Sequence, residues 1–337
     1  PEEIKYLSNP HVGSDKIRRV IPILRKHLIA RGCDIHFNCR VKQLTTDNGR
    51  VTGLETEAGD RFSSQAVILA TGHSADDIFA MLEREGVTLE GKSFAMGLRI
   101  EHPQTLINSI QFGKYPGTEE LGAANYKLAY HNADENIGVY SFCMCPGGYV
   151  LSSGTEADGL VCNGMSNYNR NSPFANSAIV VSIDHQKLFG NDIWGGMKLR
   201  RSIEQQAYRD VQAGGGSKHL PSQDVLSFAS GTPSTLTATS SPSGVVPTRL
   251  DHLFPRPVYL RLLEALEEFD RRMPGFAGPG AQLHGVETRT SCPLRVPRDT
   301  ETLESISHAG LYPVGEGAGY AGGITSAACD GVRAAEA

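Results

Sequence analysis

The strongest chemical signal in this sequence is a cluster of glycines directly after a short apolar stretch near the C-terminus. Residues 310–314 are predicted to form a strand, and Gly317, Gly319 and Gly322 then follow in the spacing G-x-G-x-x-G. Glycines let the backbone approach a ligand closely, and the helix expected over residues 325–335 would offer free N–H groups to its electron-rich atoms. Glu316 stands where it can accept hydrogen bonds from ligand hydroxyls. The alternative is a tight strand–helix packing turn without a ligand.

This turn does not qualify as a dinucleotide-binding fingerprint, although its glycines have that spacing. The fingerprint opens a β-α-β unit of ~30 residues and needs an acidic residue ~20 positions later. Only residues 323–337 follow Gly322. We therefore predict a ligand-contacting turn rather than the start of a nucleotide-binding unit.

A second candidate is the pair Cys143 and Cys145, at the end of an expected strand over residues 137–145. Cys145 is interpreted as a catalytic redox thiol or a flavin-facing residue, against the alternative that both cysteines are small core side chains before a turn. The spacing C-x-C is not the C-x-x-C of thioredoxin-like sites. No second Cys/His pair stands at zinc-ligand spacing, so no metal site is predicted.

His11 and Arg289 are two further candidates. His11 precedes a helix start and has the side chain suited to a proton donor near neutral pH, against the alternative of a hydrogen-bonded loop histidine. Arg289 could bind a substrate carboxylate with two parallel hydrogen bonds, or form an ion pair that fixes its loop. The sequence has no G-x-S-x-G elbow and no P-loop, which argues against a serine hydrolase of that type and a P-loop nucleotide hydrolase.

The elements that would position these residues follow from periodicity. Residues 15–31 show the spacing of an amphipathic helix with an apolar inner face, and residues 41–64 show strands separated by turn signals. The apolar run at residues 66–70 fits a strand covered on both faces, as in a parallel sheet. Helices are expected over residues 199–213 and 258–273. The Ser-, Thr- and Pro-rich residues 217–249 are predicted to form a long loop or lid.

The composition is that of a globular protein and argues against several other classes of protein. The 337 residues suggest two domains, and 39% apolar with 20% charged residues is typical of a globular protein. A net charge of -5 without a basic stripe argues against a nucleic-acid partner. No apolar run is long enough to predict a membrane span. Seven scattered cysteines do not form a disulfide framework, so we expect a reducing, cytoplasmic location.

Several segments together resemble a largely uncharacterised bacterial family of FAD-dependent dehydrogenases, within the FAD-dependent oxidoreductases. The similarity covers nearly the whole chain. Its matching pieces are residues 10–15, 70–75, 145–148, 287–291 and 311–324, that is PHVGSD, ATGHSA, CPGG, ETRTS and LYPVGEGAGYAGGI. Members of the family begin with a strand–GxGxxG–helix unit that carries the FAD pyrophosphate. The chain is interpreted as the part that follows this unit, so we expect it to bind FAD weakly or not at all by itself.

The resemblance also implies roles for individual residues. Val41 would hold the adenine edge through its backbone, and Ala70, Thr71 and Gly72 would line the adenosine side. Gly315 and Glu316 would face the ribitol or pyrophosphate hydroxyls. Gly322, Gly323 and Ile324 would present backbone N–H groups to the flavin pyrimidine edge, where a helix N-terminus stabilises negative charge on the reduced ring.

These observations predict an α/β fold, with a partial FAD/NAD(P)-binding Rossmann-like domain and an inserted β-rich substrate or cap domain. The expected FAD domain is discontinuous, residues 1–95 and 305–337, and the cap spans residues 96–304. The expected function is hydride or electron transfer between an organic small molecule and FAD, with NAD(P)H and a protein electron donor both open as redox partner. The alternative is an inactive binding or assembly domain on a relict flavoprotein fold. An FAD-dependent tRNA-modifying or halogenating enzyme is a third reading.

Overall fold

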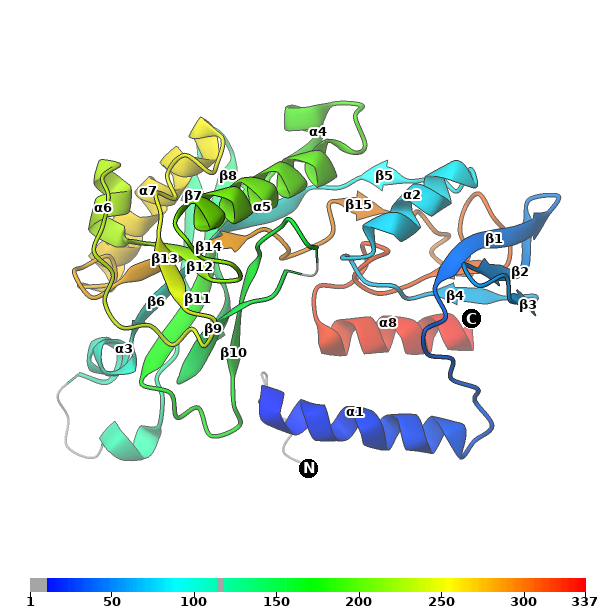
Figure 1. Cartoon of the computed structure of the whole chain (residues 1–337), viewed down its shortest axis with the longest axis horizontal. Coiled ribbons are helices and arrows are strands. Elements are labelled where there is room, and N and C mark those ends of the chain that lie inside the picture. Colours follow the sequence, from blue (N-terminus) through cyan, green and yellow to red (C-terminus); the bar gives the residue numbers. More distant parts are fainter. Residues whose placement is uncertain (1–10, 114–117, 155) are drawn as a thin grey trace. The chain divides into compact units, whose positions relative to one another are not determined.

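The computed structural model describes residues 11–113, 118–154 and 156–337 (Figure 1). Pro10, the first residue of the matching piece at residues 10–15, lies outside these ranges. The chain divides into two compact units. The larger unit contains the residues up to Asp34, Met96–Val181 and Ser202–Thr288, and the smaller unit contains Ile35–Ala95, Ser182–Arg201 and Arg289–Ala337.

These units share one boundary with the predicted domains, near residue 95, and differ elsewhere. Residues 11–34 cluster with the larger unit, while residues 182–201 and 289–304 cluster with the smaller one. The assignment of residues 1–95 and 305–337 to FAD and of residues 96–304 to a cap stays a prediction. The mixed α/β character of the chain is confirmed.

The larger unit is built on a seven-stranded mixed sheet. Its strand order is β13-β12-β14-β6-β11-β8-β7. The strands are β13 (Val245–Pro247), β12 (Leu220–Asp224), β14 (Gln282–Glu287), β6 (Phe94–Pro103), β11 (Phe174–Ile183), β8 (Ile137–Cys145) and β7 (Ala129–Asn132). β12 pairs with β13 in parallel, whereas β12–β14, β14–β6, β11–β8 and β8–β7 are antiparallel. Nearly every residue of β6 and β14 is buried, as befits central strands with both faces covered.

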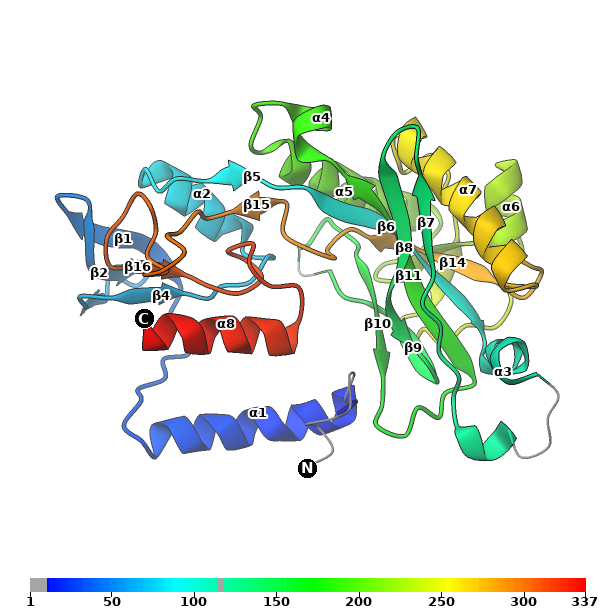
Figure 2. The ribbon, with the colours of Figure 1, turned by 180° about the vertical axis from the view of Figure 1, so that it is seen from behind.

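Helices and a hairpin surround this sheet (Figures 1 and 2). α7 (Arg256–Arg272) packs on β7 and β8, and α6 (Val225–Ser230) packs on β12. The hairpin of β9 (Gly148–Ser152) and β10 (Cys162–Ser166) contacts β8 and β14 through β10. The remaining helices are α3 (Gln104–Phe112), a 3-10 turn (Thr118–Leu121) and α5 (Gly195–Ala213). The helices predicted at 199–213 and 258–273 are therefore confirmed, with boundaries shifted by a few residues.

The smaller unit contains three small sheets. β1 (Val41–Asp47), β2 (Arg50–Thr56) and β3 (Arg61–Ser63) form the predicted antiparallel meander. β4 (Val67–Leu69) pairs in parallel with β16 (Leu311–Pro313), and β5 (Glu90–Gly91) pairs with β15 (Leu294–Arg295). Its helices are α2 (Asp76–Arg84), α4 (His185–Phe189) and α8 (Ile324–Glu336). Its core is an apolar cluster that includes Leu69, Phe79, Leu82, Leu294 and Leu311.

Three predictions about elements were wrong. The segment 217–249 is not one long loop, because it contains β12, α6 and β13. Asp224 accepts a hydrogen bond from the Ser227 backbone N–H and so caps α6, which composition does not reveal. The strand at residues 66–70 is parallel as expected but not covered on both faces, since Ile68 is 50% exposed.

The third difference concerns α1 (Ser14–Ile29), which continues through Pro22. Its predicted inner face is exposed, with Ile21 at 55% and Leu24 at 53%. Periodicity identifies the face of a helix that is suited to burial, but not whether the described chain covers it. Among the described residues, no helix combines the length and the apolar content needed to cross a bilayer.

Candidate functional site

The site in the smaller unit begins where β4 and β16 end side by side. Leu69 pairs with Pro313, and the Val314 N–H donates to the Leu69 carbonyl oxygen at 3.0 Å. Because parallel strands end at the same edge of a sheet, the turns that follow must meet. They do so with the backbones in contact: a Cβ atom on Gly317 would collide with the carbonyl oxygen of Gly72, whose φ is 73°. The two predicted cofactor-binding segments thus lie together.

The outer rim of the contact between these two turns is exposed to solvent. Ala70 and Thr71 are exposed on one turn, and Gly322, Gly323 and Ile324 are exposed on the other. Gly323 is the N-cap of α8, and no side chain caps its first turn. Free N–H groups at a helix N-terminus favour electron-rich or anionic ligand atoms. This rim therefore has the donors that the proposed flavin pyrimidine edge would need.

Glu316 lies at the contact between these two turns, where its Oε1 is 3.1 Å from His73 Nδ1. Its side chain is 29% exposed, so the carboxylate can still accept a hydrogen bond from a ligand. The sequence analysis placed Glu316 in the site but assigned no ligand role to His73. The structure puts the two side chains in direct contact.

Two arginines fix the turn that carries His73. The buried Arg200 donates to the His73 carbonyl oxygen at 3.3 Å and to Asp76 Oδ1 at 2.6 Å. Arg289 Nη1 donates to Ser74 Oγ at 2.9 Å. Arg289 is thus placed beside the Ala70–Gly72 turn, and its role toward a substrate carboxylate stays a prediction.

A buried ion pair holds the other turn. Arg298 donates to both carboxylate oxygens of Asp330 on α8, at 2.6 and 3.0 Å, and the Gly315 N–H donates to Asp330 Oδ2 at 2.8 Å. The two charged side chains are each 8% exposed. Hydrogen bonds from Arg298 lower the pKa of Asp330, with the Gly315 N–H adding to the effect. The guanidinium also lies 3.8 Å from the centre of the Tyr320 ring. This clamp joins the start of the glycine turn to α8.

A cavity of about 360 Å³ opens beside β5 and β15. It is lined by Glu90, Gly91, Lys92, Ser93 and Arg295. Burial lowers the pKa of Lys92, and the neighbouring positive charge of Arg295 lowers it further. Two cations beside one cavity make it electrostatically suited to an anionic group.

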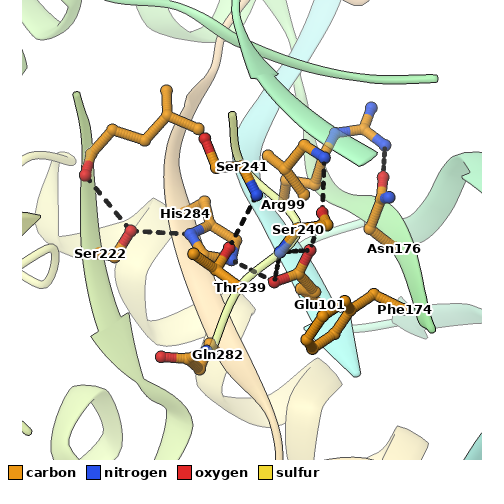
Figure 3. Close-up of polar contacts among 12 residues, drawn as sticks. Arg99, Glu101, Phe174, Asn176, Ser222, Thr239, Ser240, Ser241, Gln282 and His284 are labelled. Atoms are coloured by element: carbon orange, nitrogen blue, oxygen red, sulfur yellow. Dashed lines mark hydrogen bonds and ion pairs between the residues drawn. The ribbon is translucent and has the colours of Figure 1, made fainter. Parts of the chain in front are cut away.

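The larger unit contains a buried polar chain that reaches the loop after α6 (Figure 3). Ser222 Oγ lies 2.7 Å from His284 Nδ1, and His284 Nε2 lies 3.4 Å from Glu101 Oε2. Ser240 donates to Glu101 through its backbone N–H and its hydroxyl. Burial opposes ionisation of Glu101, but hydrogen bonds from His284 and the loop hydroxyls outweigh it and lower its pKa.

Ser222, His284 and Glu101 contact one another in the order found in a hydrolase triad. However, each of the three side chains is at most 1% exposed. A nucleophile must reach its substrate, and here none of the three reaches solvent. These polar contacts therefore serve to fix the loop around Ser240 on the sheet.

The other predicted residues are more scattered. His11 Nε2 lies 3.0 Å from the Asn167 carbonyl oxygen in the larger unit, so its role as a proton donor stays a prediction. Cys145 ends β8 in the same unit and is 6% exposed. Val41 begins β1 of the smaller unit and pairs with Thr56. Within the described ranges, no group of three or more His, Cys, Asp or Glu side chains could hold a metal ion.

The sequence analysis missed Asp330, Lys92 and Arg200. For Arg298, as for Arg289, the sequence left a carboxylate ligand and a loop-fixing ion pair open, and the structure shows an ion pair with Asp330. Arg298 and Asp330 are 32 positions apart, and Arg200 and Asp76 are 124 apart. No local spacing predicts such pairs. A charged residue among the small residues of the last helix was the only available signal for Asp330.

Two family models and one relative match this chain. Residues 93–290 match the family "FAD-dependent protein, C-terminal domain-like", and residues 14–117 match "FAD dependent oxidoreductase". A protein of Clostridium beijerinckii described as "Uncharacterized protein" is 41% identical over 339 aligned residues. The alignment covers all of this chain and 63% of that relative, so the chain spans less than two thirds of its length.

Similarity to solved structures is weak. FqzB aligns over 94% of this chain and 50% of its own, with a TM-score of 0.34 and 14% identity. GidA of Aquifex aeolicus aligns over 88% of this chain and 43% of its own, with a TM-score of 0.29 and 15% identity. Values this low carry no argument about fold or function.

Proposed function

This chain belongs to the family of FAD-dependent proteins with this C-terminal domain, and on that premise we propose that its smaller unit supplies part of an FAD site. The whole protein would transfer a hydride or electrons between an organic small molecule and FAD. The observation that carries the proposal is the contact between the Gly72 and Gly317 backbones, next to Glu316 and the uncapped start of α8. When bound, FAD supplies the hydride and electron chemistry that side chains lack.

The residues present fit such a ligand. Close approach of the two glycine turns leaves backbone atoms, rather than side chains, at the surface where a long flat ligand would lie. Ala70, Thr71 and the Val41 backbone are assigned to the adenosine side. Glu316 is assigned to ligand hydroxyls.

The remaining assignments concern the flavin end and the substrate. Gly322, Gly323 and Ile324 would bring backbone atoms and the α8 N-terminus to the ring, where the helix dipole favours negative charge. Gly315 is assigned, with Glu316, to the ribitol or pyrophosphate side. The Asp330 clamp would keep that helix in position. His11 as proton donor, Cys145 as redox thiol and Arg289 as carboxylate ligand are proposals of the same kind. NAD(P)H and a protein donor are both proposed as redox partners.

Binding of FAD tests the proposal directly. The full-length protein that contains this chain is purified, its visible spectrum is recorded, and FAD is titrated against the apoprotein. Glu316→Gln should weaken FAD binding roughly 10- to 100-fold, because a hydrogen bond to a charged acceptor is worth about 1.5–3 kcal/mol. Glu267→Gln is the control, since this exposed residue of α7 belongs to the larger unit and has no assigned role toward FAD. A protein that binds no FAD, or equal affinities for both variants and the wild type, would refute the assignment.

Reduction of the bound FAD distinguishes an active oxidoreductase from the alternative, an inactive binding or assembly domain. The FAD-loaded protein is mixed anaerobically with NADH or NADPH, and the loss of the oxidised flavin band is followed. Reduction by either donor supports the oxidoreductase. Bound FAD that dithionite reduces but neither nicotinamide reduces favours a protein donor or the inactive domain. For the 337-residue chain alone, we expect weak or no FAD binding, and a stoichiometric yellow flavin band would contradict that expectation.

A further inference from the structure

The Cys143/Cys145 pair lies at an irregularity of β8. Cys145 is opposite Asn176 on β11, but Phe142 is opposite Ala178, so β8 carries one extra residue. Cys143 falls in this bulge with a φ of 47°, in the left-handed region that side chains other than glycine seldom adopt. A bulge re-aims the side chains around it. Here Cys143 is exposed while Cys145 is buried.

The two cysteines contact each other within this bend, where the Cys145 thiol lies 3.3 Å from the Cys143 carbonyl oxygen. One cysteine is therefore open to a reagent in solution, and the second is buried two residues further along the same strand. This is the arrangement of an attacking and a resolving thiol.

A positive charge is buried beside the pair. Arg99 on β6 is fully buried, and it donates to the Cys143 carbonyl oxygen at 3.2 Å. Its other contacts are Asn176 Oδ1 at 2.9 Å and Glu287 Oε2 at 2.9 Å. Its second terminal nitrogen, Nη2, is buried and has no hydrogen-bond partner. A buried cationic donor without a partner is electrostatically suited to a negative atom nearby.

The two thiols differ in acidity. The hydrogen bond from Cys145 lowers the pKa of Cys143 to about 6, and the charge of Arg99 contributes to the lowering. The same contact and burial raise the pKa of Cys145. A thiolate is the reactive form of cysteine. The structure thus assigns nucleophilic character to Cys143 rather than to Cys145, the residue that sequence singled out.

We propose that Cys143 and Cys145 form a redox-active dithiol that closes into an intramolecular disulfide, with Cys143 attacking and Cys145 resolving. With a low-molecular-weight disulfide as oxidant, the Cys143 thiolate attacks one sulfur and forms a mixed disulfide, and one small thiolate leaves. Cys145 then loses its proton and attacks the Cys143 sulfur. The internal disulfide forms and the second small thiol leaves. Two protein thiols are oxidised, and one small disulfide is reduced to two thiols.

This inference is independent of the proposed FAD chemistry, because no step uses FAD. The other cysteines offer internal references. Cys33 and Cys329 are exposed but lie outside the pair, and Cys162 is fully buried with a raised pKa. The reaction therefore predicts selectivity within a single chain.

Peptide mass spectrometry tests the closure. The reduced protein is equilibrated with oxidised glutathione, quenched with acid, alkylated and digested. The peptide that contains both Cys143 and Cys145 should lose two hydrogens and resist alkylation. In Cys145→Ser, glutathione should remain attached to Cys143, whereas Cys143→Ser should leave Cys145 unmodified. The control Cys329→Ser should close the disulfide as the wild type does.

The pH dependence of alkylation tests the assignment of the nucleophile. At pH 5.5, about 24% of a thiol of pKa 6 is ionised, against about 0.1% of a thiol of pKa 8.5. The lower intrinsic reactivity of the more acidic thiolate reduces this ratio about 13-fold. Iodoacetamide should therefore alkylate Cys143 roughly 20-fold faster than a small reference thiol of pKa about 8.5 in the same solution.

Two results would overturn the proposal. One is a peptide that keeps both thiols free while Cys33 and Cys329 become glutathionylated. The other is equal alkylation rates at pH 5.5 for Cys143 and the small reference thiol, in a protein whose circular dichroism shows that it is folded.

Discussion

Replacing Asp330 by asparagine probes how the glycine turn is held in place. Asparagine keeps the shape and one acceptor oxygen for the Gly315 N–H, but it removes the charge that two Arg298 nitrogens contact at 2.6 and 3.0 Å. A hydrogen bond to a charged group is worth about 1.5–3 kcal/mol. Arg298 keeps its hydrogen bond to the Pro313 carbonyl oxygen and its stacking on Tyr320. We therefore expect the free energy of unfolding to fall by about 2–3 kcal/mol.

Unfolding in urea, followed by tryptophan fluorescence, measures this loss. Trp194 is the single tryptophan of the sequence, and it lies in the smaller unit with its indole N–H bonded to Glu83. The matched control is Asp77→Asn, which breaks a pair of the same type with Arg40 at a site where the side chains are 45% and 60% exposed. Exposed pairs contribute little, so the control should change stability far less.

The pH dependence gives a second check on the same variant. Because the folded pKa of Asp330 is lowered, its carboxylate stabilises the fold above the pKa of the unfolded chain, about 3.9. That stability is lost as the pH falls through the folded pKa. The difference between wild type and Asp330→Asn should thus be full at pH 7 and shrink below about pH 4. Equal losses for the two variants, or a difference that does not depend on pH, would refute the reasoning.

Three further perturbations test contacts within each unit. Gly317→Ala should lower the free energy of unfolding of the smaller unit, measured by urea titration, by about 1–3 kcal/mol, because its Cβ has no room. Gly322→Ala should change this free energy little, because nothing lies within 4 Å of an added Cβ. Burial lowers the pKa of His102 to about 4, so the unfolded chain takes up a proton first as the pH falls. The free energy of unfolding of the wild type should therefore fall by about 2 kcal/mol between pH 7 and pH 5. That of His102→Gln should fall much less, and that of the control His131→Gln, at an exposed position, should fall as in the wild type. Ser240→Ala should cost about 1.5–3 kcal/mol in circular-dichroism melts, because the buried carboxylate of β6 loses a donor; a cost near zero would mean that this contact does not fix the loop.

Local patterns determined several elements of this protein. Turn residues at Asp47–Gly49 and Gly59–Asp60 separate the three strands of the meander, and apolar spacing defines the helix around Leu262 and Phe269. These signals work because a hairpin turn and a helical face are fixed by neighbours in sequence. The G-x-G-x-x-G spacing identified the turn at Gly317, and the family resemblance added the turn at Gly72 as its partner in one site.

Tertiary structure alone decided how these pieces are held and where reactivity lies. Arg99 and Glu287 are 188 positions apart, and Arg298 and Asp330 are 32 apart, so each pair exists only because the strands and helices that carry them pack together. The bulge at Cys143 depends on the register of β8 against β11, and it leaves Cys143 exposed while Cys145 is buried. Sequence determines which residues are able to ionise, donate or attack. Burial and the partner that the fold places beside each one determine whether it does.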